Sequence, residues 1–184
     1  MLYKLNHYGI RGIPHKWLCN YFANRKQYTD FKGTNSEMMP VTCGVPQGSI
    51  LGPLLFLIYV NDVVNTSNLL RFVLYADDTN IFLSHRDKHV LQYHANIEVG
   101  KLCCWFKANK LLMNTSKTKC MIFRAGKCQS NTDIDLKIEN TTIEKVDHTH
   151  FLGVAIDNRL SWVKHIEYVC RKVSVCVGIM SKLY

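Results

Sequence analysis

The sequence lacks the patterns that would place it among zinc modules, disulfide scaffolds or membrane proteins. It has eight cysteines, but none forms a Cys-x-x-Cys pair, and no zinc-finger spacing of cysteine and histidine occurs. No secretory signal peptide opens the chain, and the longest apolar stretch, residues 50–60, is too short to cross a bilayer. We therefore expect reduced, mostly buried thiols and an intracellular protein, with nucleus and cytoplasm both open.

Acidic residues are also scarce. The chain of 184 residues contains 14 Asp and Glu against 23 Lys and Arg, which gives a net charge of +9 and a pI of about 9.2. A polyanionic partner fits this charge, but a generic basic surface would give the same value. The hydrophobic fraction of 47% is typical of a globular core, and the length favours one domain, with part of a second left open.

Helical and strand-like segments alternate along the chain, which predicts an α+β fold. Residues 50–60 are apolar on nearly every side, so this helix is expected to lie in a core, with Ser49 as its N-cap. His85 and His89 could share a helix face, where a solvated surface is favoured over a metal site. Helices are expected at 1–8, 14–24, 50–65, 89–110 and 162–183. Strands are expected at 25–32, 38–45, 72–75, 79–83, 119–124, 134–138, 142–146 and 149–156, with a turn at 33–36.

Two adjacent carboxylates occur in the tetrapeptide Tyr75-Ala76-Asp77-Asp78, between two apolar runs. Like charges at contact distance resist ionising together, and a divalent cation would stabilise both and could then take part in chemistry. An ordinary hairpin turn would contain the same residue types. The flanking strand-like runs favour a hairpin that presents the two carboxylates at its tip, where a metal could be held.

A second informative stretch runs from Gly44 to Phe56 and includes Pro46-Gln47-Gly48-Ser49. Gly48 has no side chain to block the approach of a ligand to the backbone, and Gln47 can hydrogen-bond to a base, sugar or phosphate. Alternatively, the loop only caps the following helix, so this motif alone is weak evidence for a ligand-binding site.

Together the two motifs make the sequence resemble the reverse transcriptases of non-LTR retrotransposons, similar to the Jockey-like group. The resemblance covers almost the whole chain, because further segments follow in the family's order. They are Tyr8–Gly12 with Trp17 and Arg25–Gln27; Leu57–Asp62; Trp105, Asn109, Leu111, Asn114, Lys117 and Thr118; and Phe151–Val154 with Asp157, Leu160, Trp162 and His165.

This resemblance implies an incomplete palm, an antiparallel sheet backed by helices, in which residues 1–160 belong to fingers and palm. Residues 161–184 would start a thumb or connecting helix. It implies RNA-directed DNA synthesis by two-metal nucleotidyl transfer with two Mg²⁺ or Mn²⁺ ions. The implied partners are an RNA template, a DNA primer and deoxynucleoside triphosphates, with no membrane; the oligomeric state stays open.

The resemblance also implies roles for individual residues. Asp77 would be the principal catalytic metal ligand and Asp78 the more peripheral one, with Tyr75 near the primer terminus. Lys117 would neutralise or protonate pyrophosphate, although an ordinary surface lysine is equally favoured. Pro46, Gln47 and Gly48 would contact the templating pair or the nucleotide. Leu152 and Gly153 would contact the primer from a turn that supports the primer strand. Core packing is expected for Phe151 and Trp162, and helix-end or turn roles for Asp62 and Asp157.

One part of the family's pattern is not found. The palm's other metal-binding Asp would lie on a strand upstream of Met1, and the acids before the Pro-Gln-Gly turn, Asp30 and Glu37, lack an apolar strand context. We therefore expect this chain to be inactive by itself. A non-catalytic, basic nucleic-acid-binding remnant and a relic without activity are the alternatives.

Overall fold

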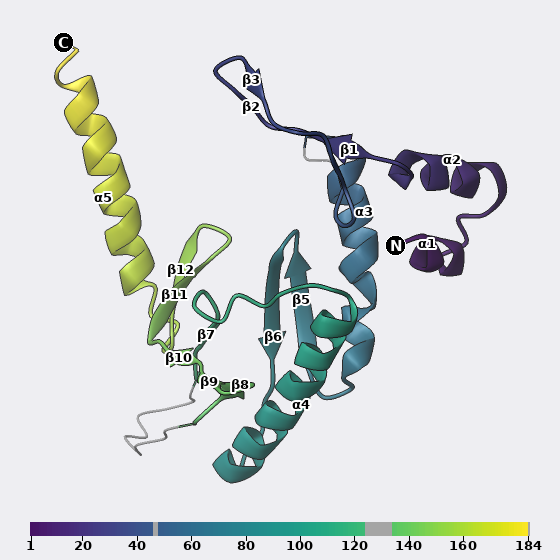
Figure 1. The fold of residues 1–184 in the computed structure, drawn as a ribbon. Coiled ribbons are helices and arrows are strands. Elements are labelled where there is room, and N and C mark those ends of the chain that lie inside the picture. The colour runs from purple at the N-terminus through teal and green to yellow at the C-terminus, as the bar shows by residue number, and fades with distance from the viewer. Residues whose placement is uncertain (46–47, 124–133, 184) are drawn as a thin grey trace. The chain divides into compact units, whose positions relative to one another are not determined.

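The computed structural model describes residues 1–45, 48–123 and 134–183. The chain forms two compact units, Met1–Phe82 and Leu83–Tyr184, each of which is described by itself. Both combine helices with small two-stranded sheets, which are antiparallel except for one parallel pair, in agreement with the predicted α+β class (Figure 1). In the described ranges, no helix combines the length and apolar character that crossing a membrane requires. The division at residue 160 into palm and thumb stays a prediction.

Three helices build the core of the first unit: α1 (Leu2–His7), α2 (Gly12–Phe22) and α3 (Leu51–Val60). Leu5, Leu18 and Leu55, one from each helix, are buried together at 0, 8 and 2% exposure. Gly9 follows α1 with φ +88°, so the chain turns there as predicted. The 3₁₀ helix η1 (Asn61–Thr66) continues α3.

Helix α3 is buried on only part of its surface. Its Leu55 is 2% exposed and belongs to the core, as expected, but Leu54 and Leu57 are 54 and 47% exposed, so the helix is apolar on more of its surface than it buries. Apolar composition does not specify how many elements pack around a helix. The N-cap is Ile50, one residue after the predicted Ser49. Ser49 Oγ nevertheless accepts a hydrogen bond from the Gly52 N–H at 3.0 Å and so satisfies one of the first N–H groups of the helix.

Between α2 and α3, residues 25–41 form a two-stranded ribbon, which is called the arm below. Its strands are β1 (Lys26–Gln27), β2 (Asp30–Phe31), β3 (Thr34–Asn35) and β4 (Met39–Pro40), paired antiparallel as β1–β4 and β2–β3 (Figure 1). The chain reverses at Lys32 and Gly33, which have φ of +52° and +80°. The turn is therefore shorter than the predicted 33–36, because Thr34 and Asn35 already pair with β2.

The hairpin of β5 (Arg71–Tyr75) and β6 (Asp78–Phe82) completes the first unit. In the second unit, α4 (Lys88–Ala108) packs on β8 (Lys137–Ile138), which pairs with β9 (Thr141–Thr142). Strand β7 (Lys119–Cys120) pairs in parallel with β10 (Glu144–Lys145). The predicted strands around these positions were longer, and the end of the predicted 119–124 strand, Arg124, lies outside the described residues.

The buried face of α4 includes Glu98, Val99, Leu102 and Cys103, whereas Ile97 is 38% exposed. The predicted strand at 149–156 is a hairpin of β11 (His148–Phe151) and β12 (Val154–Asp157), followed by α5 (Val163–Met180). This correction has a local cause, because Leu152 and Gly153 both adopt positive φ and reverse the chain.

Two expectations about burial were wrong. Trp162 precedes α5 with 53% of its surface exposed, so it does not pack in a core, whereas Phe151 is half-buried. Among the described cysteines all are free thiols, yet only Cys103 is buried, and several are exposed. The exposed ones are Cys43, Cys104, Cys170 and Cys176; Cys128 lies outside the described residues.

Candidate functional site

The β5–β6 hairpin presents the two adjacent carboxylates at its tip. Five residue pairs run from Arg71 opposite Phe82 to Tyr75 opposite Asp78, so the connecting loop consists of Ala76 and Asp77. Such two-residue loops are the tightest common connection between antiparallel strands. The predicted hairpin is therefore confirmed, and Asp77 lies in the loop while Asp78 is the first residue of β6.

The loop has a strained backbone. Ala76 adopts φ +51°, a conformation that costs an L-residue other than glycine about 1 to 2 kcal/mol. Strain of this kind often occurs where a loop must hold a functional group in place. Asp77 follows Ala76 in this loop, and the side chains of Asp77 and Asp78 are both exposed to solvent.

The chemistry of this tip suits a hard divalent cation. Carboxylate oxygens are the donors that Mg²⁺ and Mn²⁺ prefer, and a cation would offset the repulsion between two consecutive acids. Among the residues that the structure describes, no three or more His, Cys, Asp or Glu side chains gather to hold a metal. The hairpin thus offers two carboxylates, and whether they bind a metal stays a prediction.

The other residues predicted for the first unit lie around this hairpin or in the loop before α3. Tyr75 is 60% exposed and pairs with Asp78 across the hairpin. Gly48 has φ +79°, and a Cβ there would meet no atom within 4 Å, so the backbone conformation explains this glycine. Pro46 and Gln47 lie outside the described residues.

Three predicted residues belong to the second unit. Lys117 is exposed in a turn, where its N–H donates to the Asn114 carbonyl at 3.2 Å. Leu152 and Gly153 form the β11–β12 turn, as the resemblance implied. Tyr75, Asp77 and Asp78 thus share one hairpin and Leu152 and Gly153 share another. The functional roles of all these residues stay predictions.

Sequence reasoning found no role for His165 and foresaw only part of the role of Asp157. The Asp157 carboxylate accepts hydrogen bonds from Arg159 N–H at 2.9 Å, Ser161 N–H at 3.1 Å and Ser161 Oγ at 2.8 Å. His165 Nδ1, in α5, accepts the Ala155 N–H of β12 at 3.3 Å. Together they tie the start of α5 to the hairpin, and the predicted turn role of Asp157 is confirmed.

The predicted role of Asp62 at a helix end is likewise confirmed. Asp62 lies in the first turn of η1 and forms an ion pair with Lys4 of α1 at 2.6 Å. Lys4 also donates to the Tyr59 carbonyl at 2.7 Å. These contacts join the first helix to the end of α3, a connection that helical periodicity could not reveal.

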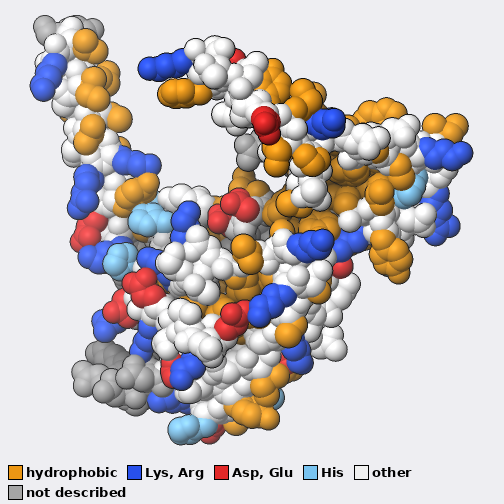
Figure 2. All heavy atoms as spheres, in the orientation of Figure 1, with side chains coloured by type: hydrophobic (Ala, Val, Ile, Leu, Met, Phe, Trp, Pro, Cys, Tyr) orange, Lys and Arg blue, Asp and Glu red, His pale blue; other side chains and the backbone are white. Residues whose placement is uncertain are grey.

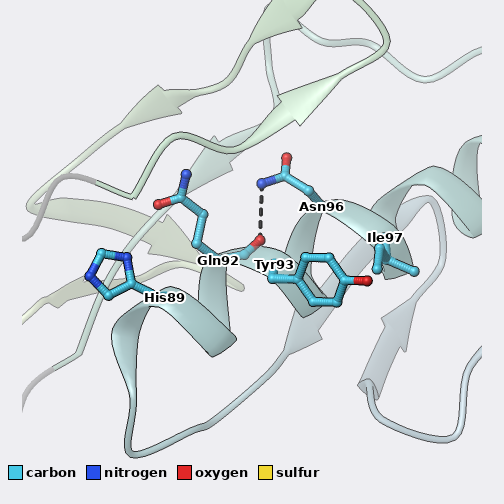
Figure 3. A pocket seen from close by; sticks show the side chains of 5 residues that line it. All are labelled: His89, Gln92, Tyr93, Asn96 and Ile97. Carbon is cyan, nitrogen blue, oxygen red and sulfur yellow. Dashed lines mark hydrogen bonds between the residues drawn. The ribbon is translucent and has the colours of Figure 1, made fainter.

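A hollow of about 540 Å³ lies along α4, lined by His89, Gln92, Tyr93, Asn96 and Ile97 (Figure 3). Asn96 donates from Nδ2 to the Gln92 and Asp135 carbonyls, both at 3.0 Å, and its Oδ1 accepts the Lys137 N–H at 2.9 Å. This amide therefore fastens β8 to α4, and its polar atoms serve the packing of the unit.

Acid should weaken the attachment of α5 through Asp157. The Ser161 N–H and hydroxyl, with the Arg159 N–H, hold the pKa of Asp157 below its ordinary 3.8. A carboxyl group with a lowered pKa stabilises the folded state above its unfolded pKa, and this stabilisation is lost as pH falls through the folded pKa. We expect the protection of the Ser161 amide against exchange, relative to its intrinsic rate at each pH, to fall below about pH 4. In Asp157→Asn this protection should be lower already at pH 7, without that acid step.

Glu144→Gln is the control for this prediction, because it removes an exposed carboxylate of the same unit. It should keep the acid step of the wild-type chain. An unchanged acid step in Asp157→Asn would show that another group controls the attachment of α5.

Comparison with known proteins identifies the family of the chain that contains this hairpin. The family model described as reverse transcriptase (RNA-dependent DNA polymerase) matches residues 2–156. The chain therefore belongs to the reverse transcriptase family. The resemblance to non-LTR retrotransposon enzymes is confirmed by its curated relatives.

These relatives are retrotransposon proteins of insects. The chain is 27% identical over 81% of its length to the probable RNA-directed DNA polymerase from transposon X-element of Drosophila melanogaster. It is 26% identical over 91% to the Pol polyprotein from the type-1 retrotransposable element R1 of Bradysia coprophila. It is 24% identical over 89% to the RNA-directed DNA polymerase from mobile element jockey of D. melanogaster. The chain spans only 16 to 18% of the length of these relatives. No solved structure gives a significant match.

Proposed function

We propose that this chain is part of the polymerase domain of a Jockey-like non-LTR retrotransposon and that its parent protein copies RNA into DNA. One observation carries the proposal: two consecutive carboxylates, Asp77 and Asp78, lie at the tip of a tight hairpin inside the region that matches the reverse transcriptase family. The X-element and jockey relatives are themselves named RNA-directed DNA polymerases.

In the proposed mechanism Asp77 and Asp78 hold Mg²⁺ or Mn²⁺. The two ions of the complete site would activate the primer 3′-hydroxyl and offset charge on the triphosphate and the leaving pyrophosphate. The short loop fixes the backbone of Asp77 with respect to β5 and β6, so little backbone reorganisation would be needed when substrate binds. Tyr75, exposed beside Asp78, would contact the primer terminus.

The remaining residues would act on the nucleic acid and the nucleotide. Lys117 would neutralise or protonate pyrophosphate, a role that suits its exposed ammonium. Leu152 and Gly153 would support the primer from the tip of the β11–β12 hairpin. Residues 161–184, which include α5, would begin the thumb or a connecting helix. Pro46, Gln47 and Gly48 would contact the templating pair or the incoming nucleotide.

The 184-residue chain by itself should not polymerise DNA. Two carboxylates of one hairpin rarely fix two metal ions in catalytic geometry, and a further carboxylate on a neighbouring strand would complete the site. Within the described ranges no third ligand joins Asp77 and Asp78. We infer that the missing ligand comes from another part of the parent protein.

Primer extension tests both parts of this proposal. With an RNA template, a DNA primer and Mg²⁺, a full-length polymerase that carries residues 1–184 should extend the primer, and the purified chain should not. If the full-length protein did not extend the primer, the proposed function would be wrong. Robust extension by the 184-residue chain alone, abolished by Asp77→Ala, would show that the chain already contains a complete catalytic site.

A non-catalytic nucleic-acid-binding role is the second candidate, and the net charge of +9 favours it. Such binding would depend on phosphate contacts and weaken steeply as salt rises. The two candidates are distinguished by synthesis in the full-length protein. Binding without any metal-dependent synthesis would favour the second.

A further inference from the structure

We propose that the arm, residues 25–41, binds single-stranded nucleic acid by stacking bases on its exposed aromatic rings. This contact would be additional to the Asp77–Asp78 hairpin and independent of metal ions. The arm contains aromatic side chains interleaved with lysines on a ribbon that the chain exposes along its whole length. Aromatic platforms beside basic groups are the common means of binding single strands without sequence preference.

The arm is ordered by its own hydrogen bonds. The Val41 N–H donates to the Arg25 carbonyl at 2.8 Å, where the ribbon leaves the helices. Halfway along, Thr29 and Ser36 exchange two bonds of 2.9 Å, one through Ser36 Oγ. The ladder therefore continues through both strand pairs to the turn. Such order presents the side chains at fixed positions, which lowers the entropy cost of binding.

The arm exposes an unusual amount of apolar surface for so short a segment. Phe31 is 70% exposed and Tyr28 is 53% exposed, while Met38 and Met39 are 60 and 61% exposed. Figure 2 shows hydrophobic and basic side chains next to each other at the tip of the β2–β3 hairpin. An isolated two-stranded hairpin is only marginally stable in water, so a ligand that covers these side chains would stabilise the arm.

The charges of the arm favour a polyanion that carries planar groups. Lys32 Nζ lies 5.6 Å from the centre of the Phe31 ring, so a base on that ring would have a cation nearby for its phosphate. Lys26 adds a second exposed cation. Two carboxylates oppose the cations of the arm: Asp30 accepts the Gly33 N–H at 3.1 Å and so serves the turn, and Glu37 lies exposed between β3 and β4. With Arg25, Lys26 and Lys32 against these two carboxylates, the arm keeps a net charge of +1. A single strand supplies both the bases and the phosphates that this arrangement can bind.

Fluorescence anisotropy with labelled 12-nucleotide RNA and DNA of one sequence tests this proposal, using the 184-residue chain in EDTA at 150 mM salt. Each stacked base is worth about 1 to 3 kcal/mol by alanine substitution. Tyr28→Ala with Phe31→Ala removes two stacking rings and should therefore weaken binding by about 30-fold or more. Lys32→Gln should reduce the slope of log K against log salt by about 0.7.

Tyr3→Ala with Tyr93→Ala is the matched control, because these tyrosines are 84 and 65% exposed elsewhere in the chain. The control should bind like wild type. Tighter binding of RNA than of DNA would identify the template as the ligand. Equal binding would mean that the arm binds single-stranded RNA and DNA alike, and both results support the proposal. Three results would overturn the proposal. They are equal weakening of binding by the two double variants, no binding by the wild-type chain, and self-association that depends on the arm without any effect on oligonucleotide binding. Because EDTA removes metal ions, such a failure leaves the proposed role of Asp77 untouched.

Discussion

Asp77→Asn in a full-length polymerase that carries residues 1–184 is expected to lower RNA-templated DNA synthesis by about 10³-fold or more. The substitution keeps the shape of the side chain but removes the charge that would hold the metal. Metal ions contribute several kcal/mol to stabilising the transition state of such reactions, and each 1.36 kcal/mol is a factor of ten in rate. Single-turnover primer extension with Mg²⁺ measures this loss, while template–primer affinity should change little.

Two further variants make this result specific. Asp78→Asn should cause a smaller loss, because we assign Asp78 the more peripheral position. Glu167→Gln removes an exposed carboxylate that pairs with Lys164 at 3.2 Å in α5, and it should leave synthesis unchanged. If Asp77→Asn retained activity within about threefold of the Glu167→Gln control, the hairpin would not hold the catalytic metal.

Leu55→Ala should destabilise the first unit by about 2 to 5 kcal/mol. Leu55 is 2% exposed and packs with Leu5 and Leu18 where α1, α2 and α3 meet. Truncation of a buried leucine removes transfer free energy and leaves a cavity that the surrounding helices fill only in part. Urea unfolding, followed by far-UV circular dichroism and by amide exchange in α1 and α2, measures the change.

The neighbouring residue offers a matched control. Leu54 belongs to the same helix but is 54% exposed, so Leu54→Ala should change stability by no more than about 0.5 kcal/mol. Equal destabilisation by the two substitutions would mean that α3 is covered on both sides.

The Asp77–Asp78 hairpin was predictable because its signals are local. Two strand-like runs leave only a short connection, and consecutive acids favour its tip. The β11–β12 hairpin was misread as one strand because its apolar run continues through Leu152, and only the positive φ of Leu152 and Gly153 reverses the chain. Local pattern thus predicted the first turn and missed the second, although the resemblance implied it.

Burial and long-range hydrogen bonds were less predictable. The exposure of Leu54 depends on how many elements pack against α3, which its sequence does not encode. The bond from the Ala155 N–H to His165 joins two elements across a turn, and no periodicity indicates it. Within the candidate site, residue types indicated the carboxylates, whereas the metal ligand needed to complete the site cannot be read from the hairpin.

Binding of Mn²⁺ to the 184-residue chain, followed by NMR, tests the central claim most directly. Paramagnetic Mn²⁺ broadens the amide signals of residues near its binding site, and two exposed carboxylates can bind it without catalysis. We predict selective broadening at Tyr75–Thr79 that disappears in the Asp77→Asn, Asp78→Asn double variant. Unchanged broadening there in the double variant, or broadening confined to other acids, would contradict the assignment of this hairpin as the metal-binding element.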